Sequence, residues 1–364
     1  MQRAADNYRL CKSKINKKII AVVKANAYGH GANEISLRLM REGCRSFAVS
    51  NVTEAVNLRR AGVEGEIIIL GYVMPFEARA LKEYALTAVI YDESSYNIIS
   101  ESNVKLPVYL KIDTGMRRLG FNSGDYKILQ KIMLADGVDV KGLFTHFSCA
   151  DTLRGEDLEY TSRQAESFCE IADRLNKISH RKLPLYACAG AGAARLKEEL
   201  YDGVRIGISL YGIKASDEVF ETDILPVMTL KSVISTVKTI ENADFVSYGR
   251  TYAADKTIKT AVVSAGYADG YNRALSNKGR ILVNGKYARV LGNVTMDQTV
   301  IDVSEINAET GDEVILFGGG GQSVGEVART CDTIPYEIVC GISARVIRVF
   351  TENGKTVSIR DNTF

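Results

Sequence analysis

The feature that most constrains the fold is a regular alternation of short apolar runs with helical segments through about the first 215 residues. The apolar runs are rich in β-branched residues, which predicts strands, and the segments between them carry apolar residues at three- and four-residue spacing, which predicts helices. Such alternation is typical of βαβ units, and eight strands of this kind predict a (β/α)8 TIM barrel. The predicted strands cover residues 18–24, 46–50, 66–70, 87–91, 107–113, 140–146, 183–188 and 205–210, and the clearest helices cover residues 33–42, 53–61, 75–84 and 158–177.

The pattern changes after about residue 220, where strand-like runs follow one another directly. Gly, Asn and Asp turns such as Asn284-Gly285 and Asn353-Gly354 separate these runs, which favours antiparallel pairing. We therefore expect an α/β chain of two domains. Residues 1–219 would form the (β/α)8 barrel, and residues 220–364 would form a mostly antiparallel β domain.

Charge and composition exclude several classes of function. The 46 basic and 44 acidic residues leave a net charge of +2, which predicts neither a nucleic-acid partner nor an anionic membrane surface. No apolar run approaches the roughly 20 residues of a spanning helix, and the N-terminus lacks the apolar core of a signal peptide. Seven scattered cysteines without a C-x-x-C pair indicate reduced thiols, and three histidines make a metal site improbable. We expect a cytoplasmic protein that binds no metal.

The segment AVVKANAYGHG, residues 21–31, carries the most chemical information. An apolar strand ends there in Lys24, and the active sites of TIM barrels lie at the C-terminal ends of their strands. A lysine partly removed from water at that position can form a Schiff base with an aldehyde cofactor. A lysine at a strand end can also extend into solvent, and periodicity alone favours that simpler interpretation.

The segment as a whole, however, resembles the pyridoxal-phosphate lysine motif of the alanine racemases. The resemblance covers nearly the whole chain, and its motifs occur in the family's order. It implies a pyridoxal 5′-phosphate cofactor and the interconversion of the mirror-image forms of a small amino acid. The further motifs are LKIDTGMRRLG (110–120), GLFTHF (142–147), VRIGISLYG (204–212), SYGRTY (247–252), GYADG (266–270), VTMDQ (294–298) and PYE (335–337).

Two residues match the acid and base groups of the family. By this resemblance Lys24 would hold the cofactor and would also exchange a proton on one face of the substrate Cα, while Tyr248 would act on the opposite face. Racemisation removes a proton from one side and returns it on the other, so groups on both faces suit the reaction. A phenol is a poor base near pH 7 unless a cationic neighbour lowers its pKa, so Tyr248 needs such a neighbour.

Other matching residues would hold the cofactor. Arg205 matches the arginine that contacts the pyridine nitrogen, and because arginine only donates, the resemblance implies that this nitrogen stays unprotonated. Tyr28 and the backbone amides around Gly207 and Ile208 resemble the phosphate cradle. His146 resembles the histidine that supports the pyridine-contacting arginine.

The remaining matches concern the substrate and the partner subunit. Arg118 matches the arginine that contacts the cofactor phenolate and the substrate carboxylate, and Lys111 stands where the family often carries a carbamylated lysine. Met296 would bind the substrate carboxylate through its backbone, and Tyr267 would line the entry. In the family the β domain of one chain supplies the residues matched by Tyr248, Tyr267 and Met296 to the barrel of the other, which implies a homodimer with shared active sites.

The chain departs from the family pattern at three places. It begins within the first helix, near Asp6, without the W-x-E-I-D-L strand that usually precedes it, so we expect a trimmed start or a fragment of a longer protein. Gly190 stands where the family has a phosphate-contacting serine, which predicts weaker cofactor retention. Ala344 replaces a common tyrosine near the phosphate and the substrate, which predicts a roomier pocket.

The resemblance predicts an alanine racemase that supplies D-alanine for peptidoglycan. One alternative is a serine or broad-specificity racemase, since the serine racemase domains of glycopeptide resistance, membrane-tethered in full length, carry similar replacements. Another is a pyridoxal-phosphate-binding protein with little activity, although the small relatives of that kind lack a β domain. The decarboxylases of the same architecture fit less well, because their lysine motif and glycine-rich phosphate loop differ.

Overall fold

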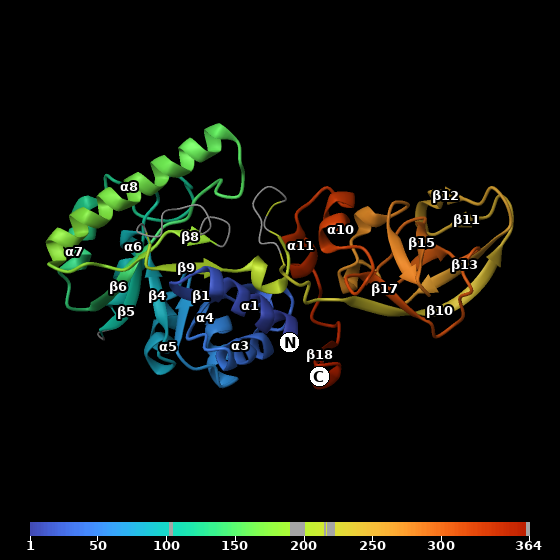
Figure 1. The fold of residues 1–364 in the computed structure, drawn as a ribbon, viewed down its shortest axis with the longest axis horizontal. Helices are drawn as coiled ribbons and strands as arrows, with labels where there is room; N and C mark the ends of the chain where they lie inside the picture. Colours follow the sequence, from blue (N-terminus) through green and yellow to red (C-terminus); the bar gives the residue numbers. More distant parts are fainter. Residues whose placement is uncertain (102–104, 190–200, 215, 217–222, 362–364) are drawn as a thin grey trace. The chain divides into compact units, whose positions relative to one another are not determined.

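The computed structural model describes residues 1–101, 105–189, 201–214, 216 and 223–361. The chain forms two compact units, of which the first comprises Met1–Ala27 and Gly31–Leu225. The second comprises Tyr28–His30 and Pro226–Phe364. Figure 1 labels many of the elements of both units.

The first unit contains a parallel sheet that curls toward closure (Figure 1). Its strand order is β7-β6-β5-β4-β3-β2-β1-β9-β8, so the two outermost strands, β7 and β8, are consecutive in the chain and come from the single run predicted at residues 183–188. This arrangement is a near-closed barrel and confirms the predicted fold class. The strands are β1 (Lys18–Val22), β2 (Ser46–Val49), β3 (Glu66–Ile69), β4 (Thr87–Ile90), β5 (Leu106–Lys111), β6 (Val138–Phe144), β7 (Leu185–Tyr186), β8 (Cys188–Ala189) and β9 (Gly203–Ile206).

The helices of the first unit follow the strands as the periodicity predicts. Every residue of β2, β4 and β9 is buried, as expected for parallel strands covered on both faces. Side-chain caps fix the start of two helices: Asn51 accepts a hydrogen bond from the Glu54 amide, and Asp92 accepts one from the Ser95 amide. The helices are α1 (Gln2–Lys14), α3 (Ala32–Arg41), α4 (Val52–Arg60), η1 (Pro75–Glu77), α5 (Ala78–Glu83), α6 (Glu93–Ser100), α7 (Tyr126–Met133) and α8 (Gly155–Ser179).

One predicted strand is wrong over most of its length. Residues 205–210 were expected to be extended, but β9 ends at Ile206 and the chain enters a 3-10 helix, η3 (Ile208–Tyr211). Gly207, with φ −117° and ψ −97°, leaves the extended conformation and makes the change of direction. An apolar run therefore contains both the end of a strand and a turn at the barrel mouth.

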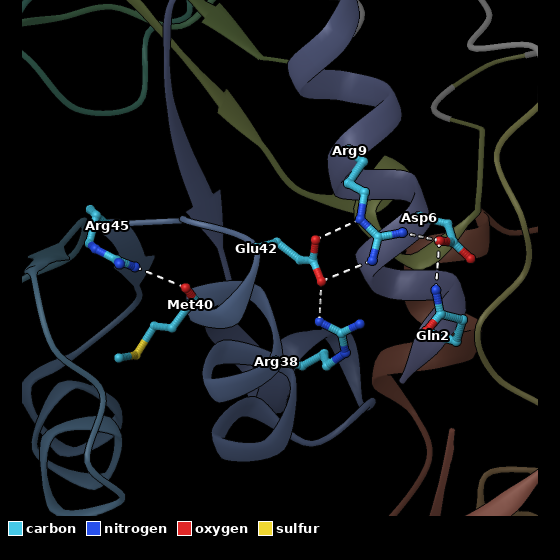
Figure 2. A network of polar contacts seen from close by, with 7 residues as sticks. All are labelled: Gln2, Asp6, Arg9, Arg38, Met40, Glu42 and Arg45. Carbon is cyan, nitrogen blue, oxygen red and sulfur yellow. Dashed lines mark hydrogen bonds and ion pairs between the residues drawn. The ribbon is translucent and has the colours of Figure 1, made fainter. Parts of the chain in front are cut away.

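A network of charges ties α1 to α3 (Figure 2). The Glu42 carboxylate accepts hydrogen bonds from Arg9 Nε at 2.6 Å and Nη2 at 3.0 Å, and it also pairs with Arg38, whose side chain is buried. Arg9 pairs in addition with Asp6 at 2.6 Å. The hydrogen bonds from Arg9 and Arg38 lower the pKa of Glu42 to about 2, so this carboxylate is ionised at neutral pH.

The second unit is built on a closed antiparallel barrel with the strand order β10-β13-β16-β15-β14-β17, which confirms the predicted β domain (Figure 1). Two short helices, α10 and α11, interrupt the strand-rich region and were not predicted. The elements are β10 (Leu230–Ile240), β11 (Phe245–Val246), η4 (Tyr248–Arg250), β12 (Tyr252–Ala253), β13 (Ile258–Val263), η5 (Tyr267–Asp269), η6 (Arg273–Leu275), β14 (Arg280–Val283), β15 (Lys286–Leu291), β16 (Thr299–Asp302), β17 (Glu313–Phe317), α10 (Val324–Thr330), α11 (Pro335–Cys340), β18 (Arg348–Glu352) and β19 (Lys355–Arg360).

Over the described residues, the structure contains no helix of the length and apolar character that a membrane crossing requires.

Candidate active site

Lys24 lies directly beyond β1 and begins an unusual turn, α2 (Lys24–Tyr28). Its side chain is half-buried. The four residues after it, Ala25, Asn26, Ala27 and Tyr28, have φ angles of 52°, 53°, 53° and 52°. The left-handed helical region costs about 1–2 kcal/mol for each residue with a side chain, so a run of four needs support from its surroundings.

Hydrogen bonds on both sides of the turn supply that support within the first unit. The Ala27 amide donates to the Val23 carbonyl at 2.9 Å, and the Asn26 side chain accepts from the Ala32 amide at 2.9 Å. Glu54, in α4, accepts from the Ala25 amide at 2.7 Å. Strained backbone held in this way is typical of functional sites, and here it fixes the direction of the chain immediately after Lys24.

Arg205 extends from β9, the strand that pairs with β1. Only 6% of this residue is exposed. Its Nη1 donates to the Tyr186 carbonyl at 2.7 Å, and its Nη2 donates to the Thr145 carbonyl at 2.6 Å. The guanidinium also lies 5.0 Å from the centre of the Phe144 ring, a cation–π distance. Backbone acceptors at the end of β7 and directly after β6 therefore fix the position of this buried charge.

His146 is a neutral hydrogen-bond acceptor for Arg205. The two side chains approach at 3.3 Å through Arg205 Nη2 and His146 Nδ1. Because arginine only donates, Nδ1 accepts and the ring proton is assigned to Nε2. Burial, together with the positive charge of Arg205 and Arg118, lowers the pKa of His146 to about 3.

Lys111 and Arg118 add further positive charge near Arg205 and Lys24. Lys111 ends β5, and its pKa is lowered to about 8, first by burial and then by the charge of Arg118, Arg205 and Lys24. Asp113 opposes this effect, but its carboxylate already accepts hydrogen bonds from the Gly115 and Arg117 amides at 2.8 and 3.1 Å. The excess of cations suits an anionic ligand such as a phosphate, a phenolate or a carboxylate.

Gly207 and Ile208 lie at the same end of the sheet as Lys24. Tyr211, at the end of η3, donates its hydroxyl hydrogen bond to the Val22 carbonyl at 2.9 Å, which fastens η3 to the last residue of β1. The first N–H groups of a helix have no acceptor within it, and Ile208 provides the first of them here. Main-chain donors directly after a barrel strand are where TIM barrels commonly bind phosphate.

Tyr28 and Gly29 group with the second unit, where they pack against α11. The Tyr28 ring lies 6.0 Å from the Tyr336 ring, and burial raises the pKa of the Tyr28 phenol, so it remains a hydrogen-bond donor. Gly29 has φ +81°, and a Cβ there would lie 2.1 Å from the Val339 carbonyl oxygen. Arg348 donates to the Gly29 carbonyl at 2.8 Å. Only glycine permits this close packing at position 29.

The second unit brings Tyr248, Tyr267 and Met296 into one cluster of loops. The Asn293 side chain donates to the Tyr248 carbonyl at 2.7 Å. The Tyr267 amide donates to the Thr295 carbonyl at 2.9 Å, and the next amide along the chain donates to the Met296 carbonyl at 3.0 Å. All three predicted side chains are exposed, Tyr248 by 77%.

Gly266 makes the contact between the Tyr267 turn and the Met296 loop possible. A Cβ at position 266 would lie 2.2 Å from the Thr295 carbonyl oxygen and 2.4 Å from that of Met296. The sequence pattern assigned no role to Asn293 or to Arg345, although both are bonded to this cluster. Their contribution depends on partners far along the chain, which no local motif reveals.

Of the two positions that depart from the family pattern within the body of the chain, Gly190 lies outside the described residues. Ala344 is exposed in the turn between α11 and β18. Among the described residues, no group of His, Cys, Asp and Glu side chains is arranged to hold a metal ion.

Comparison with known proteins gives one consistent result along the whole chain. Residues 1–215 match the family described as alanine racemase, N-terminal domain, and residues 227–350 match alanine racemase, C-terminal domain. An alanine racemase of Clostridium perfringens is 40% identical over 359 residues, which is 95% of this chain and 92% of the relative. An alanine racemase of Desulforamulus reducens is 40% identical over 345 residues, or 92% of each chain.

The solved structures agree with the sequence relatives. An alanine racemase of Clostridium difficile 630 superposes with a TM-score of 0.94 at 32% identity and covers 100% of this chain and 97% of its own. An alanine racemase of Bacillus anthracis with bound L-Ala-P superposes with a TM-score of 0.93 at 29% identity, over 100% of this chain and 96% of its own.

Proposed function

This chain belongs to the alanine racemase family, and on that premise we propose that it interconverts L- and D-alanine with pyridoxal 5′-phosphate as cofactor. The observation that carries the proposal is the group of cations at the strand ends of the first unit. The positive charges of Arg118, Arg205 and Lys24 all act on the Lys111 amine, and Lys24 lies directly beyond a barrel strand.

The residues of the first unit fit this cofactor. The Lys24 amine would hold its aldehyde carbon, and Arg205, already buried and fixed by two carbonyls, would donate to the pyridine nitrogen. The amides of Gly207 and Ile208 would bind the phosphate. When bound, pyridoxal phosphate supplies an electron-accepting ring that makes the Cα proton of an attached amino acid acidic.

The protein's own groups would then move the proton. Lys24 takes or gives it on one face of Cα, and Tyr248 does so on the other. Tyr248, Tyr267 and Met296 are exposed on the second unit of a single chain, which supports a homodimer in which they complete the partner's site. The partner would also provide the cationic environment that a phenol requires in order to act as a base.

Arg118 and Lys111 are proposed to bind the substrate side of the site. Arg118 would contact the substrate carboxylate, and the partner subunit's Met296 would bind the same group through its backbone. The lowered pKa of Lys111, about 8, supports carbamylation, because only the neutral amine combines with carbon dioxide. The resulting negative charge would orient the Arg118 guanidinium.

The D-alanine produced would serve peptidoglycan synthesis in the cytoplasm, as is typical of the family. A serine or broad-specificity racemase remains a second candidate because Ala344 is a small, exposed residue where the family commonly has tyrosine. A cofactor-binding protein without turnover is disfavoured by the intact loop cluster that carries Tyr248.

A chiral assay of the purified protein with added pyridoxal phosphate, using L-alanine and L-serine in parallel, tests these alternatives. We expect a rapid approach to an equal mixture with alanine and a slow one with serine. Serine racemised as fast as alanine would assign the second function. Cofactor binding without turnover of either amino acid would contradict both racemase proposals.

A further inference from the structure

Arg345 bridges the two loops of the second unit that carry Tyr267 and Met296. Its Nε lies 2.8 Å from Asp269 Oδ1, and its Nη2 lies 2.7 Å from Asp297 Oδ1. Asp269 is the last residue of η5, which begins at Tyr267, and Asp297 directly follows Met296. One side chain thus holds two loops whose carboxylates are 28 positions apart in the sequence (297 − 269).

Asp269 transmits this contact to the backbone of the turn. Its second carboxylate oxygen accepts a hydrogen bond from the Gly266 amide at 2.9 Å. The same turn donates from the Tyr267 amide to the Thr295 carbonyl at 2.9 Å. The turn and the Met296 loop are therefore connected by backbone bonds at one end and by Arg345 at the other.

The exposure of these groups indicates a role other than stabilising the fold. In the pair with Asp297, the Arg345 side chain is 40% exposed and that of Asp297 is 59% exposed, whereas Asp269 is 19% exposed. Ion pairs with this degree of exposure contribute little to the free energy of unfolding. A planar guanidinium does, however, fix the separation of two carboxylates more narrowly than a point charge can.

We propose that Arg345 is a positioning residue for substrate binding: it fixes the Met296 loop against the Tyr267 turn so that the Met296 backbone is ready to receive the substrate carboxylate. The inference rests on the proposed function, since it assigns Arg345 a part in the same reaction. The strands that flank these loops, β13 and β16, already pair, with Val263 opposite Thr299, and Arg345 adds a side-chain contact between the loops themselves.

The test compares Arg345→Met, Asp297→Asn and the double variant with the wild-type holoenzyme in the alanine assay. We expect Arg345→Met to raise KM about tenfold, which corresponds to about 1.4 kcal/mol of binding, with a much smaller change in kcat. Asp297→Asn should show most of the same effect. The double variant should be no worse than Arg345→Met alone, because Asp297 acts through Arg345. Arg345→Lys should restore part of the affinity.

Lys231→Met is the matched control, because it breaks a similarly exposed ion pair, with Glu313, elsewhere in the same unit. It should leave both kinetic constants unchanged. Hydrogen exchange of the cofactor-free protein gives a second measurement that does not depend on activity. Amides of residues 266–271 and 293–298 should exchange faster in Arg345→Met than in the wild type, and Lys231→Met should not change them.

An unchanged KM and unchanged exchange in Arg345→Met would overturn the proposal, as would additive effects in the double variant. Equal losses of kcat and affinity in Arg345→Met and Lys231→Met would also overturn it, since they would indicate general loosening of the domain. A wild-type protein that does not racemise alanine would overturn the proposed function and the substrate role of Arg345 with it. Faster exchange in that case would still support the bridge between the loops.

Discussion

The two units hold their proposed functional residues in different ways. Arg205 is buried on a barrel strand, and its donors are directed at backbone carbonyls at the end of β7 and directly after β6. Tyr248 is 77% exposed on a loop, and the side chain of Asn293 holds its backbone. The contacts of Arg205 are part of the barrel packing, whereas Tyr248 lies on a loop outside the barrel strands of the second unit.

This difference determines where one substitution should affect both activity and stability. A residue fixed by buried backbone acceptors leaves those acceptors unsatisfied when it is removed, so its loss affects both folding and chemistry. A residue on an exposed loop has few such partners, so its loss should affect chemistry alone. Substitutions in the two units should therefore separate activity from stability to different degrees.

The largest effect on activity is expected at the two proposed proton-transfer groups. Tyr248→Phe should lower kcat for alanine by about 10²–10⁴-fold, the usual contribution of a positioned acid or base. Lys24→Ala should lower it further, because it removes a proton-transfer group and the cofactor anchor together. A chiral assay measures both losses. Thermal unfolding of Tyr248→Phe should match the wild type. A marked fall in its melting temperature would contradict the expectation that loop residues of the second unit affect activity alone.

Arg205→Met should reduce both activity and stability. The substitution removes the Arg205 donors to both carbonyls. Tyr186 keeps a hydrogen bond from the Thr145 amide at 3.3 Å, whereas the Thr145 carbonyl loses its Arg205 donor, and an unsatisfied buried group costs about 1–3 kcal/mol. Urea unfolding of the cofactor-free protein should show this loss, and racemisation should fall because nothing donates to the pyridine nitrogen. A variant that unfolds at the wild-type urea concentration would show that the barrel does not depend on Arg205.

The sequence predicted the first unit better than the second for a physical reason. Buried parallel strands are continuous apolar runs, so β1 to β6 were found with errors of a few residues at their ends. The left-handed turn after Lys24 could not be predicted, because its intrinsic preference is unfavourable and only tertiary contacts hold it. Helices α10 and α11, only 7 and 6 residues long, have too few turns for a clear apolar period.

The candidate site likewise contains residues that local sequence could predict and residues that it could not. Lys24 stands at the end of an apolar strand, so its position at the barrel mouth could be inferred from the chain itself. Arg345 could not be assigned, because its partners lie 76 and 48 positions away and the pairing exists only in the folded second unit. Asn293 is likewise 45 positions from Tyr248. Roles that arise from such distant pairs require the structure.

The pH dependence of stability should reveal the crowding of cations in the first unit. The pKa of Lys111 is lowered from 10.5 to about 8. Below pH 8 the Lys111 amine is therefore protonated in the folded protein, although burial and the neighbouring cations disfavour its charge. Between pH 8 and 10.5 the unfolded state binds more protons at this residue, and stability therefore rises with pH through that window. The gain from this group should be no more than about 1–3 kcal/mol.

Urea unfolding of the wild type and of Lys111→Met, from pH 7.5 to 10 in buffer free of carbon dioxide, measures that gain. The advantage of the variant should shrink as pH rises, because the wild type loses its unfavourable proton. Other groups that titrate in this range affect both proteins equally and cancel in the difference. A constant difference across the range would mean that the cations do not crowd Lys111.

Asn293→Ala should have a smaller effect, confined to kcat. It removes one hydrogen bond to the Tyr248 carbonyl, and a bond of this kind contributes about 1 kcal/mol, or about fivefold in rate. The melting temperature should change little, because Asn293 is only half-buried and lies on a loop. A loss in KM rather than kcat would place Asn293 with the Met296 loop instead of with Tyr248.

Glu42→Gln should have the smallest effect of these substitutions, and it tests a charge bridge in the first unit against the Arg345 bridge in the second. Glu42 is held by Arg9 and Arg38, the inverse of Arg345 held by two aspartates, but it joins helices rather than loops of the proposed site (Figure 2). We expect a loss of about 1 kcal/mol in the free energy of unfolding, with kcat and KM unchanged. The pKa of Glu42 is lowered from 4.5 to about 2, so its contribution is complete above pH 4.5 and declines as the pH falls toward 2.

Urea unfolding of both proteins between pH 7 and pH 3 tests this directly. The wild type should exceed Glu42→Gln by a constant amount down to about pH 4.5, and the difference should narrow below it. If Glu42→Gln instead altered KM as Arg345→Met is expected to do, a charge bridge in either unit would influence substrate binding. The kinetic effect of Arg345 could then no longer be attributed to its place between the Tyr267 turn and the Met296 loop.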